Sequence, residues 1–289
     1  MQDGRRRYTL PYLEVTLSGS SLVVLQWDDP KVYAPDMGLP GPNADIDIAL
    51  IDDAFNVISG SFSDNFFTGA PLEIFSPFAF GTYRLIVTRF SGDAPSFFKV
   101  VFSTSSVQSP LLSSSTIYGH YNAKGSIAVG AAPYDWTPGF GVSPAIQESF
   151  SSAGGTPIFI DTNGDRLFKE EVRLKPAFTG VDGTCTTFFG SFNAFGTNCY
   201  NFFGTSAAAP NAAAVAALML EVQPRLQPDN NRDIMIRSSE DMDDTFTSNY
   251  DFGFDFGTGA GFLNALSAVG FAALRAVKAK VKRTKGTAI

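Results

Sequence analysis

The run GTSAAAPNAAAVAALML, residues 204–220, constrains the fold more than any other stretch of the sequence. Alanine and leucine favour a helix and Pro224 follows its end, so we predict a buried helix over Ala207–Glu221. Pro210 is expected within the first turn, where its missing N–H costs nothing. Small side chains would let such a helix lie close against a sheet.

A hydroxyl stands at the start of this predicted helix. Gly204 lets the backbone turn sharply, and Thr205 and Ser206 follow it. A helix N-terminus offers unpaired N–H groups and positive potential, which stabilise an oxyanion beside the hydroxyl. The alternative is that Ser206 or Thr205 only caps an alanine-rich core helix. Local chemistry alone favours the capping interpretation.

The first third of the chain has the pattern of strands. The segments SLVVLQW, DIDIALID, TYRLIVTRF and SFFKVVF are alternating or apolar and are bounded by Gly, Pro, Asp or Ser. No helical pattern interrupts residues 12–103, which predicts a small antiparallel β-sandwich over residues 1–104. Asp45 and Asp47 alternate with Ile46 and Ile48, so we expect a strand with a solvated acidic face; half of a calcium site is the alternative.

After residue 105 the pattern changes to that of an α/β domain. SIAVGAA, flanked by glycines, predicts a short strand of a buried parallel sheet. DTNGDRLFKEEV has some spacing of a calcium loop, but Gly164 stands at its fourth position and Val172 at its twelfth, so we predict a plain β-turn. We therefore predict no metal ligand set and no cofactor, with a structural calcium ion left open. NRDIMIRSSEDM predicts a short helix, and GFLNALSAVGFAALRAVKAKVKRTKG a closing amphipathic helix.

Charge and cysteine content limit the classes of partner. The net charge of −7 argues against a nucleic-acid partner, which requires a basic face. The longest apolar stretch, Ala207–Leu220, is shorter than the ~18 to 20 residues that cross a bilayer, so we predict no membrane span. The N-terminus has basic residues without an apolar segment behind them, so no signal peptide is predicted. Cys185 and Cys199 are either two buried thiols or a disulfide, and both interpretations stay open.

The wider sequence around Ser206 resembles a known family. GTSAAAPNAAAVAALML is similar to the nucleophile segment Gly-Thr-Ser-x-Ala-x-Pro of the subtilisin-like serine peptidases, the subtilases. SIAVGAA, ESFSSAGG, LKPAFTGVDG and GTGAGFLNALSAV resemble further landmarks in the family's order. The resemblance covers roughly residues 115–270. It implies the C-terminal part of a parallel-sheet catalytic domain over residues 105–289, preceded by an inserted β-sandwich.

By this resemblance the chain would contribute to serine endopeptidase chemistry. Ser206 would attack the scissile carbonyl of a polypeptide substrate, and its own N–H would supply half of the oxyanion hole. Thr205 and Gly204 would shape the turn. Asn211 stands where many relatives have histidine, a position outside the triad. The family also implies an extracellular or cell-envelope location.

The partners of the nucleophile are missing from this sequence. The single histidine, His120, lies in YGHYNAKGSIAVGAA and does not resemble the family's His-Gly-Thr segment. An Asp-x-Gly strand end and an oxyanion Asn are also absent. Since losing the base costs about 10⁶-fold in turnover, we expect the chain to be inactive alone. We expect the missing N-terminal half of the same domain as its partner, with Met1 an internal methionine; the alternative is a non-catalytic pseudo-peptidase or binding module acting through the sandwich.

Overall fold

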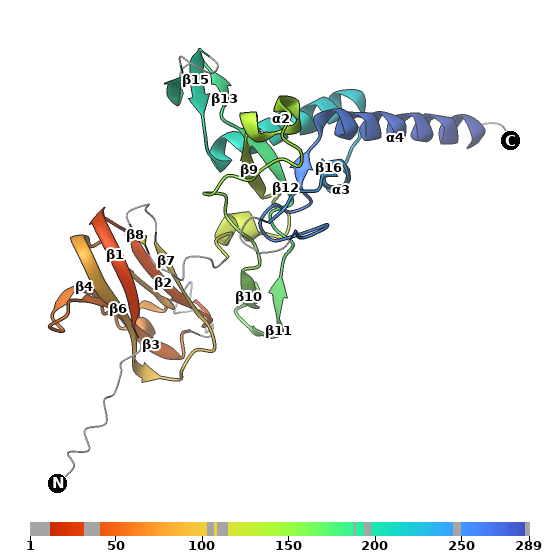
Figure 1. The fold of residues 1–289 in the computed structure, drawn as a ribbon. Coiled ribbons are helices and arrows are strands. Elements are labelled where there is room, and N and C mark those ends of the chain that lie inside the picture. Colours follow the sequence, from red (N-terminus) through yellow and green to blue (C-terminus); the bar gives the residue numbers. More distant parts are fainter. Residues whose placement is uncertain are drawn as a thin grey trace, which may run out of the picture. The chain divides into compact units, whose positions relative to one another are not determined.

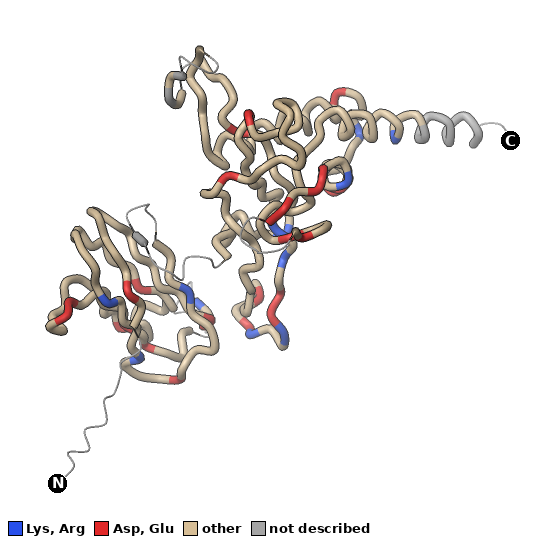
Figure 2. Tube along the Cα trace, in the orientation of Figure 1, with Lys and Arg blue, Asp and Glu red and all other residues tan. Residues whose placement is uncertain are grey.

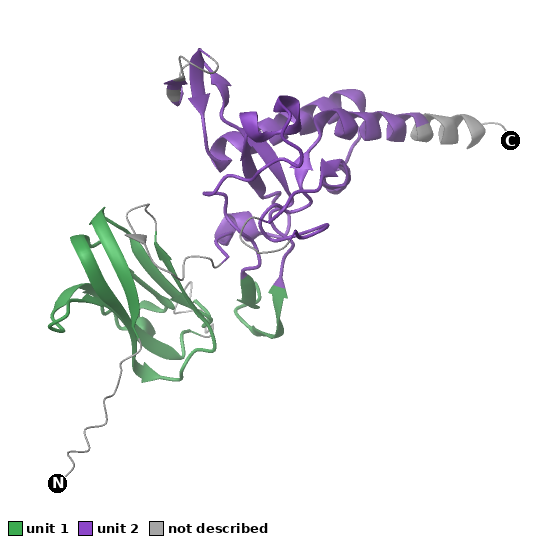
Figure 3. Ribbon diagram, in the orientation of Figure 1, with its two compact units in different colours: residues 1–113, 157–171 green, residues 114–156, 172–289 purple. Residues whose placement is uncertain are grey.

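The computed structural model describes residues 12–31, 41–102, 107–108, 115–187, 189–193, 198–244 and 250–286. The chain divides into two compact units, one of residues 1–113 with 157–171 and the other of residues 114–156 with 172–289 (Figure 3). The boundary expected at residue 104 lies outside the described residues. Residues 157–171, expected in the second domain, count with the first unit.

Two antiparallel sheets form most of the first unit (Figure 1). One has the order β4 (Val57–Ser61), β3 (Ala44–Ile51), β6 (Phe78–Gly92), β1 (Leu13–Ser20) and β8 (Val107–Gln108). The other has the order β5 (Leu72–Phe75), β2 (Val23–Trp27) and β7 (Phe98–Phe102). Their inward side chains share one core, which includes Val15, Leu17, Val23, Leu25, Ile48, Leu50, Phe75 and Leu85. Alternation along β1 and β2 therefore encodes the buried faces of both sheets.

The expected solvated acidic face of β3 is wrong. Asp45 is only 6% exposed, because the short helix α1 (Asn65–Thr68) covers it. The Asn65 side chain accepts the Ile46 N–H at 2.9 Å and donates to Glu73 at 2.7 Å. Burial, together with the charges of Asp45 and Glu73, raises the pKa of Asp47. No group of three possible metal ligands occurs in the described part of the chain.

A hairpin of β10 (Pro157–Ile160) and β11 (Arg166–Val172) completes the first unit. The Asp161 carboxylate accepts the N–H groups of Asn163 at 2.8 Å and Asp165 at 3.0 Å, and the turn is the β-turn that the sequence predicted. Basic and acidic residues gather on this hairpin (Figure 2). Phe159 contacts the ring of Phe97, with centroids 5.3 Å apart.

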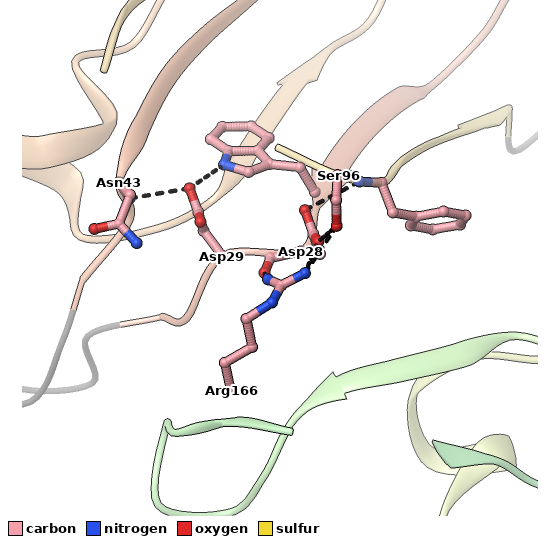
Figure 4. A network of polar contacts seen from close by, with 7 residues as sticks. Asp28, Asp29, Asn43, Ser96 and Arg166 are labelled. Carbon is pink, nitrogen blue, oxygen red and sulfur yellow. Dashed lines mark hydrogen bonds and ion pairs between the residues drawn. The ribbon is translucent and has the colours of Figure 1, made fainter. Parts of the chain in front are cut away.

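A polar network joins the hairpin to β2 (Figure 4). Arg166 pairs with the carboxylate of Asp28 and donates to the Asp28 carbonyl oxygen at 2.9 Å and to Ser96 at 2.8 Å. The N–H of Phe97 donates to Asp28 at 3.2 Å. The Asp28 side chain is 1% exposed, so this buried charge is fully paired.

The second unit is built on a four-stranded sheet of order β16 (Ser239–Glu240), β17 (Phe262–Leu263), β12 (Phe178–Asp182) and β9 (Val129–Pro133). β12 runs parallel to β9 and β17, and β16 is antiparallel to β17. Three helices accompany the sheet: α2 (Thr205–Val222), α3 (Pro228–Arg237) and α4 (Ala265–Gly286) (Figure 1). Phe178, Met219 and Met235 lie in the core between them, each at most 2% exposed.

The helix α2 is longer than the sequence predicted. It begins at Thr205 and ends at Val222, so by length and composition its 18 residues are long and apolar enough to cross a membrane. The expectation that no stretch is long enough is therefore wrong. The sign is weak, since core helices of other proteins pass the same test, and Ala207, Ala208, Ala212 and Met219 of α2 are buried within the unit.

Cys185 and Cys199 form a disulfide, which resolves the alternatives left open by the sequence. Their Cα atoms are 5.7 Å apart, within the range that a disulfide requires. The bond links β13 (Thr184–Thr186) to β15 (Cys199–Phe202), and β15 also pairs with β14 (Ser191–Asn193). This three-stranded extension follows β12 and leads into α2.

Candidate active site

The parallel strands β9 and β12 end side by side, at the same end of the sheet. Asp182, the last residue of β12, is in register with Pro133, the last residue of β9. The chain leaves through Gly183 into the extension and returns along β15, where the Phe202 carbonyl oxygen accepts the Gly183 N–H at 2.8 Å. Gly204 therefore arrives directly beside Asp182.

Gly204 forms the sharp turn into α2. Its φ of 133° and ψ of 155° lie in a region that side chains other than glycine rarely adopt. Its N–H donates to Oδ2 of Asp182 at 2.6 Å, and its carbonyl oxygen accepts the N–H of Ala207 at 2.8 Å. No side chain of α2 caps the helix, so the capping interpretation of Thr205 and Ser206 is wrong.

Ser206 is the second residue of α2 and its side chain is exposed, while Thr205 is the first and is half-buried. The first N–H groups of a helix have no partner within it. Across the residues that the structure describes, neither the Thr205 N–H, the Ser206 N–H nor the Ser206 hydroxyl has a hydrogen-bond partner. An exposed hydroxyl thus stands beside two free donors.

Small residues hold α2 against β12. A Cβ atom at Gly180 would come within 3.0 Å of the Ala208 carbonyl oxygen, so the strand and the helix meet backbone to backbone. Asn211 donates to the Val181 carbonyl oxygen at 2.9 Å. Pro210 is the sixth residue of α2 and lies beyond the first turn, contrary to expectation. Its missing N–H leaves the Ser206 carbonyl without its usual helical partner.

Three carboxyl groups lie near the turn. Burial is the main cause that raises the pKa of Asp182, and the negative charge of Asp135 raises it further. The hydrogen bond from the Gly204 N–H offsets only part of this increase. Burial likewise raises the pKa of Glu148, and the charges of Asp182 and Asp135 add to this. Asp182 and Glu148 therefore both hold their protons more strongly than an ordinary carboxyl group.

An aromatic cluster lies at the same carboxyl end of the parallel strands. Tyr134, in the short helix η3 (Tyr134–Trp136), has its ring centroid 5.3 Å from that of Phe140 and 6.5 Å from that of Phe203. Phe203 lies so close to Gly183 that a Cβ atom there would come within 2.4 Å of its ring. Phe140 and Phe203 are 64% and 46% exposed. The turn at Gly204 is thus bordered by apolar surface open to solvent.

His120 lies near the opposite end of the sheet, where the parallel strands begin. It is exposed within a short helix, η2 (Gly119–Asn122). The carbonyl oxygen of Asn122 accepts a hydrogen bond from Arg173 at 2.7 Å, which places η2 near the amino end of β12. Ser206 follows the carboxyl end, and a strand of five residues spans roughly 16 Å. The structure does not bring His120 and Ser206 together.

Sequence reasoning located Gly204, Thr205 and Ser206 on one turn and missed the acids around it. The signal for Asp182 was present in FTGVDG, where an acidic residue ends a buried strand just before glycine. Asp135 and Glu148 carry no comparable signal, because their approach to Asp182 depends on the pairing of β9 with β12.

Comparisons with known proteins agree with this architecture. The model of the subtilase family matches residues 31–261. The solved structure of the CspB protease of Clostridium perfringens superposes with a TM-score of 0.55 at 15% identity, over 92% of this chain and 55% of that one. The chain therefore spans about half the length of that protease, and the likeness shows the fold. Among curated proteins, no sequence matches significantly.

Proposed function

The chain belongs to the subtilase family, and on that premise we propose that it carries the nucleophile of a serine endopeptidase, Ser206. The observation that carries the proposal is the placement of an exposed hydroxyl at the start of α2, beside two N–H groups that have no partner among the described residues. Gly204 and Thr205 shape the turn that presents it. Polypeptides are the substrates that the family implies.

The reaction follows from this geometry. The Ser206 Oγ attacks the scissile carbonyl carbon, and its proton passes to a base. The carbonyl oxygen becomes an oxyanion, which the Ser206 N–H and the positive end of α2 stabilise. The protonated base then gives its proton to the leaving amine, and water releases the acyl group by the same steps.

We propose that the base, its Asp partner and a side-chain oxyanion donor come from polypeptide other than residues 1–289. His120 is the only histidine of the chain. It lies near the amino ends of the parallel strands, whereas Ser206 lies near their carboxyl ends. β9 ends the sheet order of the described strands, so its free edge is available to further parallel strands. The coverage of 55% of the CspB protease is consistent with this division.

An extracellular or cell-envelope location forms part of the proposal. Secretion is common among subtilases. The disulfide between Cys185 and Cys199 supports it, since such bonds persist in oxidising compartments and are rare in the cytosol.

The experiment compares peptide hydrolysis by residues 1–289 alone with hydrolysis by the polypeptide that joins them to a subtilase segment carrying the Asp, the His and the oxyanion Asn. We expect no hydrolysis by the chain alone and measurable hydrolysis by the joined polypeptide. Ser206→Ala should abolish it, and Ser267→Ala, in the first turn of α4, should leave it intact. Hydrolysis that survives Ser206→Ala would refute the nucleophile.

The alternative is a non-catalytic protein that binds through the two-sheet unit. The distance of His120 from Ser206 favours it, together with the separate core of the first unit. A joined polypeptide that folds but hydrolyses no peptide and leaves Ser206 unlabelled by a fluorophosphonate would support this alternative.

A further inference from the structure

The nucleophile turn has an anchor outside its own helix. Asp182 is fully buried at the end of β12, and its Oδ2 accepts the Gly204 N–H at 2.6 Å across 22 residues of sequence. An N-cap side chain normally fixes only the first turn of its own helix. Here the acceptor belongs to the central strand, so the bond ties the start of α2 to the sheet.

The choice of amide matters for the neighbouring donors. Asp182 takes the N–H of Gly204, which precedes the helix, and leaves those of Thr205 and Ser206 without partners in the described structure. A cap on the first helical amides would occupy the groups that an oxyanion requires. The anchor therefore holds the turn without blocking it.

Burial of the Asp182 carboxyl group is also unfavourable for the stability of the fold. Asp182 is 0% exposed, and its Oδ1 has no hydrogen-bond partner among the residues described. No lysine or arginine in the described part of the chain forms an ion pair with it, while the charges of Asp135, in η3, and Asp182 repel and Glu148 lies near enough to feel the charge of Asp182. Burial raises its pKa. A buried, unpaired acid beside a reactive hydroxyl indicates a functional role more than a stabilising one.

We propose that Asp182 is a positioning residue for Ser206, acting through the Gly204 N–H. This inference rests on the proposed peptidase function and names the group that aligns its nucleophile. Without the bond, Gly204 is free to leave its rare conformation, and the hydroxyl and the two donors lose their common alignment. A misplacement of about 1 Å can cost about 10²-fold in rate.

The test uses the joined polypeptide with Asp182→Ala, Asp182→Asn and, as a control, Glu221→Ala at the far end of α2. Asp182→Ala should lower kcat at least tenfold and change KM less than about threefold, since alignment and not substrate binding is lost. Asp182→Asn should retain most of kcat, because its amide oxygen accepts the same N–H. Glu221→Ala should resemble the parent.

Amide hydrogen exchange of Gly204 gives a readout that is independent of turnover. Loss of one hydrogen bond should accelerate this exchange about tenfold in Asp182→Ala, and much less in Asp182→Asn. Unchanged kcat and unchanged exchange in Asp182→Ala, with an active parent, would overturn the positioning role alone. An inactive parent would instead overturn the peptidase proposal and this role with it.

Discussion

At the scale of single residues, the buried acid Asp182 makes stability depend on pH. Its pKa in the folded chain is raised above the ordinary value of 3.8 by burial. Its contribution to stability is therefore fully present below that value and is lost as pH rises through the folded pKa. Asp182→Asn carries no such loss, so its unfolding free energy should improve relative to the parent as pH rises. Urea unfolding of both proteins from about pH 3 to about pH 8 measures this.

A control with the opposite sign is available in the first unit. Hydrogen bonds from Asn56 lower the pKa of Asp52, so Asp52→Asn should lose stability relative to the parent at neutral pH and regain it in acid. A difference between Asp182→Asn and its parent that stays constant with pH would contradict the raised pKa of Asp182.

The same residues show what a sequence can predict at this scale. Gly204, Thr205 and Ser206 are neighbours in sequence, and the helix signal behind them is local, so their shared turn could be predicted. Asp182 could not be assigned, because 22 residues and a three-stranded extension separate it from the amide that it holds. Pairings that depend on tertiary structure leave no local pattern.

At the scale of elements, the hairpin of β10 and β11 depends on one buried pair. Burial raises the pKa of Asp28, but its hydrogen bonds with Ser96, Arg166 and Phe97 outweigh this and lower it overall. Arg166→Met removes the charged partner and leaves Asp28 buried. We expect a loss of about 1 to 3 kcal/mol in unfolding free energy by urea at neutral pH.

The control for this hairpin is Lys169→Met, which removes an exposed positive charge from the same strand. It should change stability by less than about 0.5 kcal/mol. Equal effects of the two substitutions would mean that the hairpin is held by general charge and not by the Asp28–Arg166 pair.

The limits of sequence reasoning differ among the elements. The helix α2 could be predicted to within two residues because alanine and leucine dominate it, although Pro210 then falls in its interior. The acidic face of β3 was misjudged, because the four residues of α1 that bury Asp45 have too little pattern to be recognised. The disulfide could not be decided, since it depends on the register of β13 with β15.

At the scale of the whole molecule, the two units have separate hydrophobic cores and should unfold as separate transitions. Leu25 and Met219 are 0% exposed in the first and second cores, and truncation of such side chains costs about 2 to 5 kcal/mol. Leu25→Ala should lower only one calorimetric transition, and Met219→Ala only the other. A simultaneous shift of both transitions would contradict independent units.

The order of these two unfolding transitions tests our proposal that another polypeptide segment completes the catalytic domain. The second unit leaves Leu218 and Val222, one turn apart on α2, at least 40% exposed, and the edge of β9 is free among the described strands. A sheet with a free edge and an uncovered apolar helix face is less stable than a closed one. The transition that responds to Met219→Ala should therefore come first in the chain alone. Joining the segment that supplies the base should raise the temperature of this transition, because further strands would pair with β9. A second unit that melts last and is unaffected by joining would favour the non-catalytic alternative.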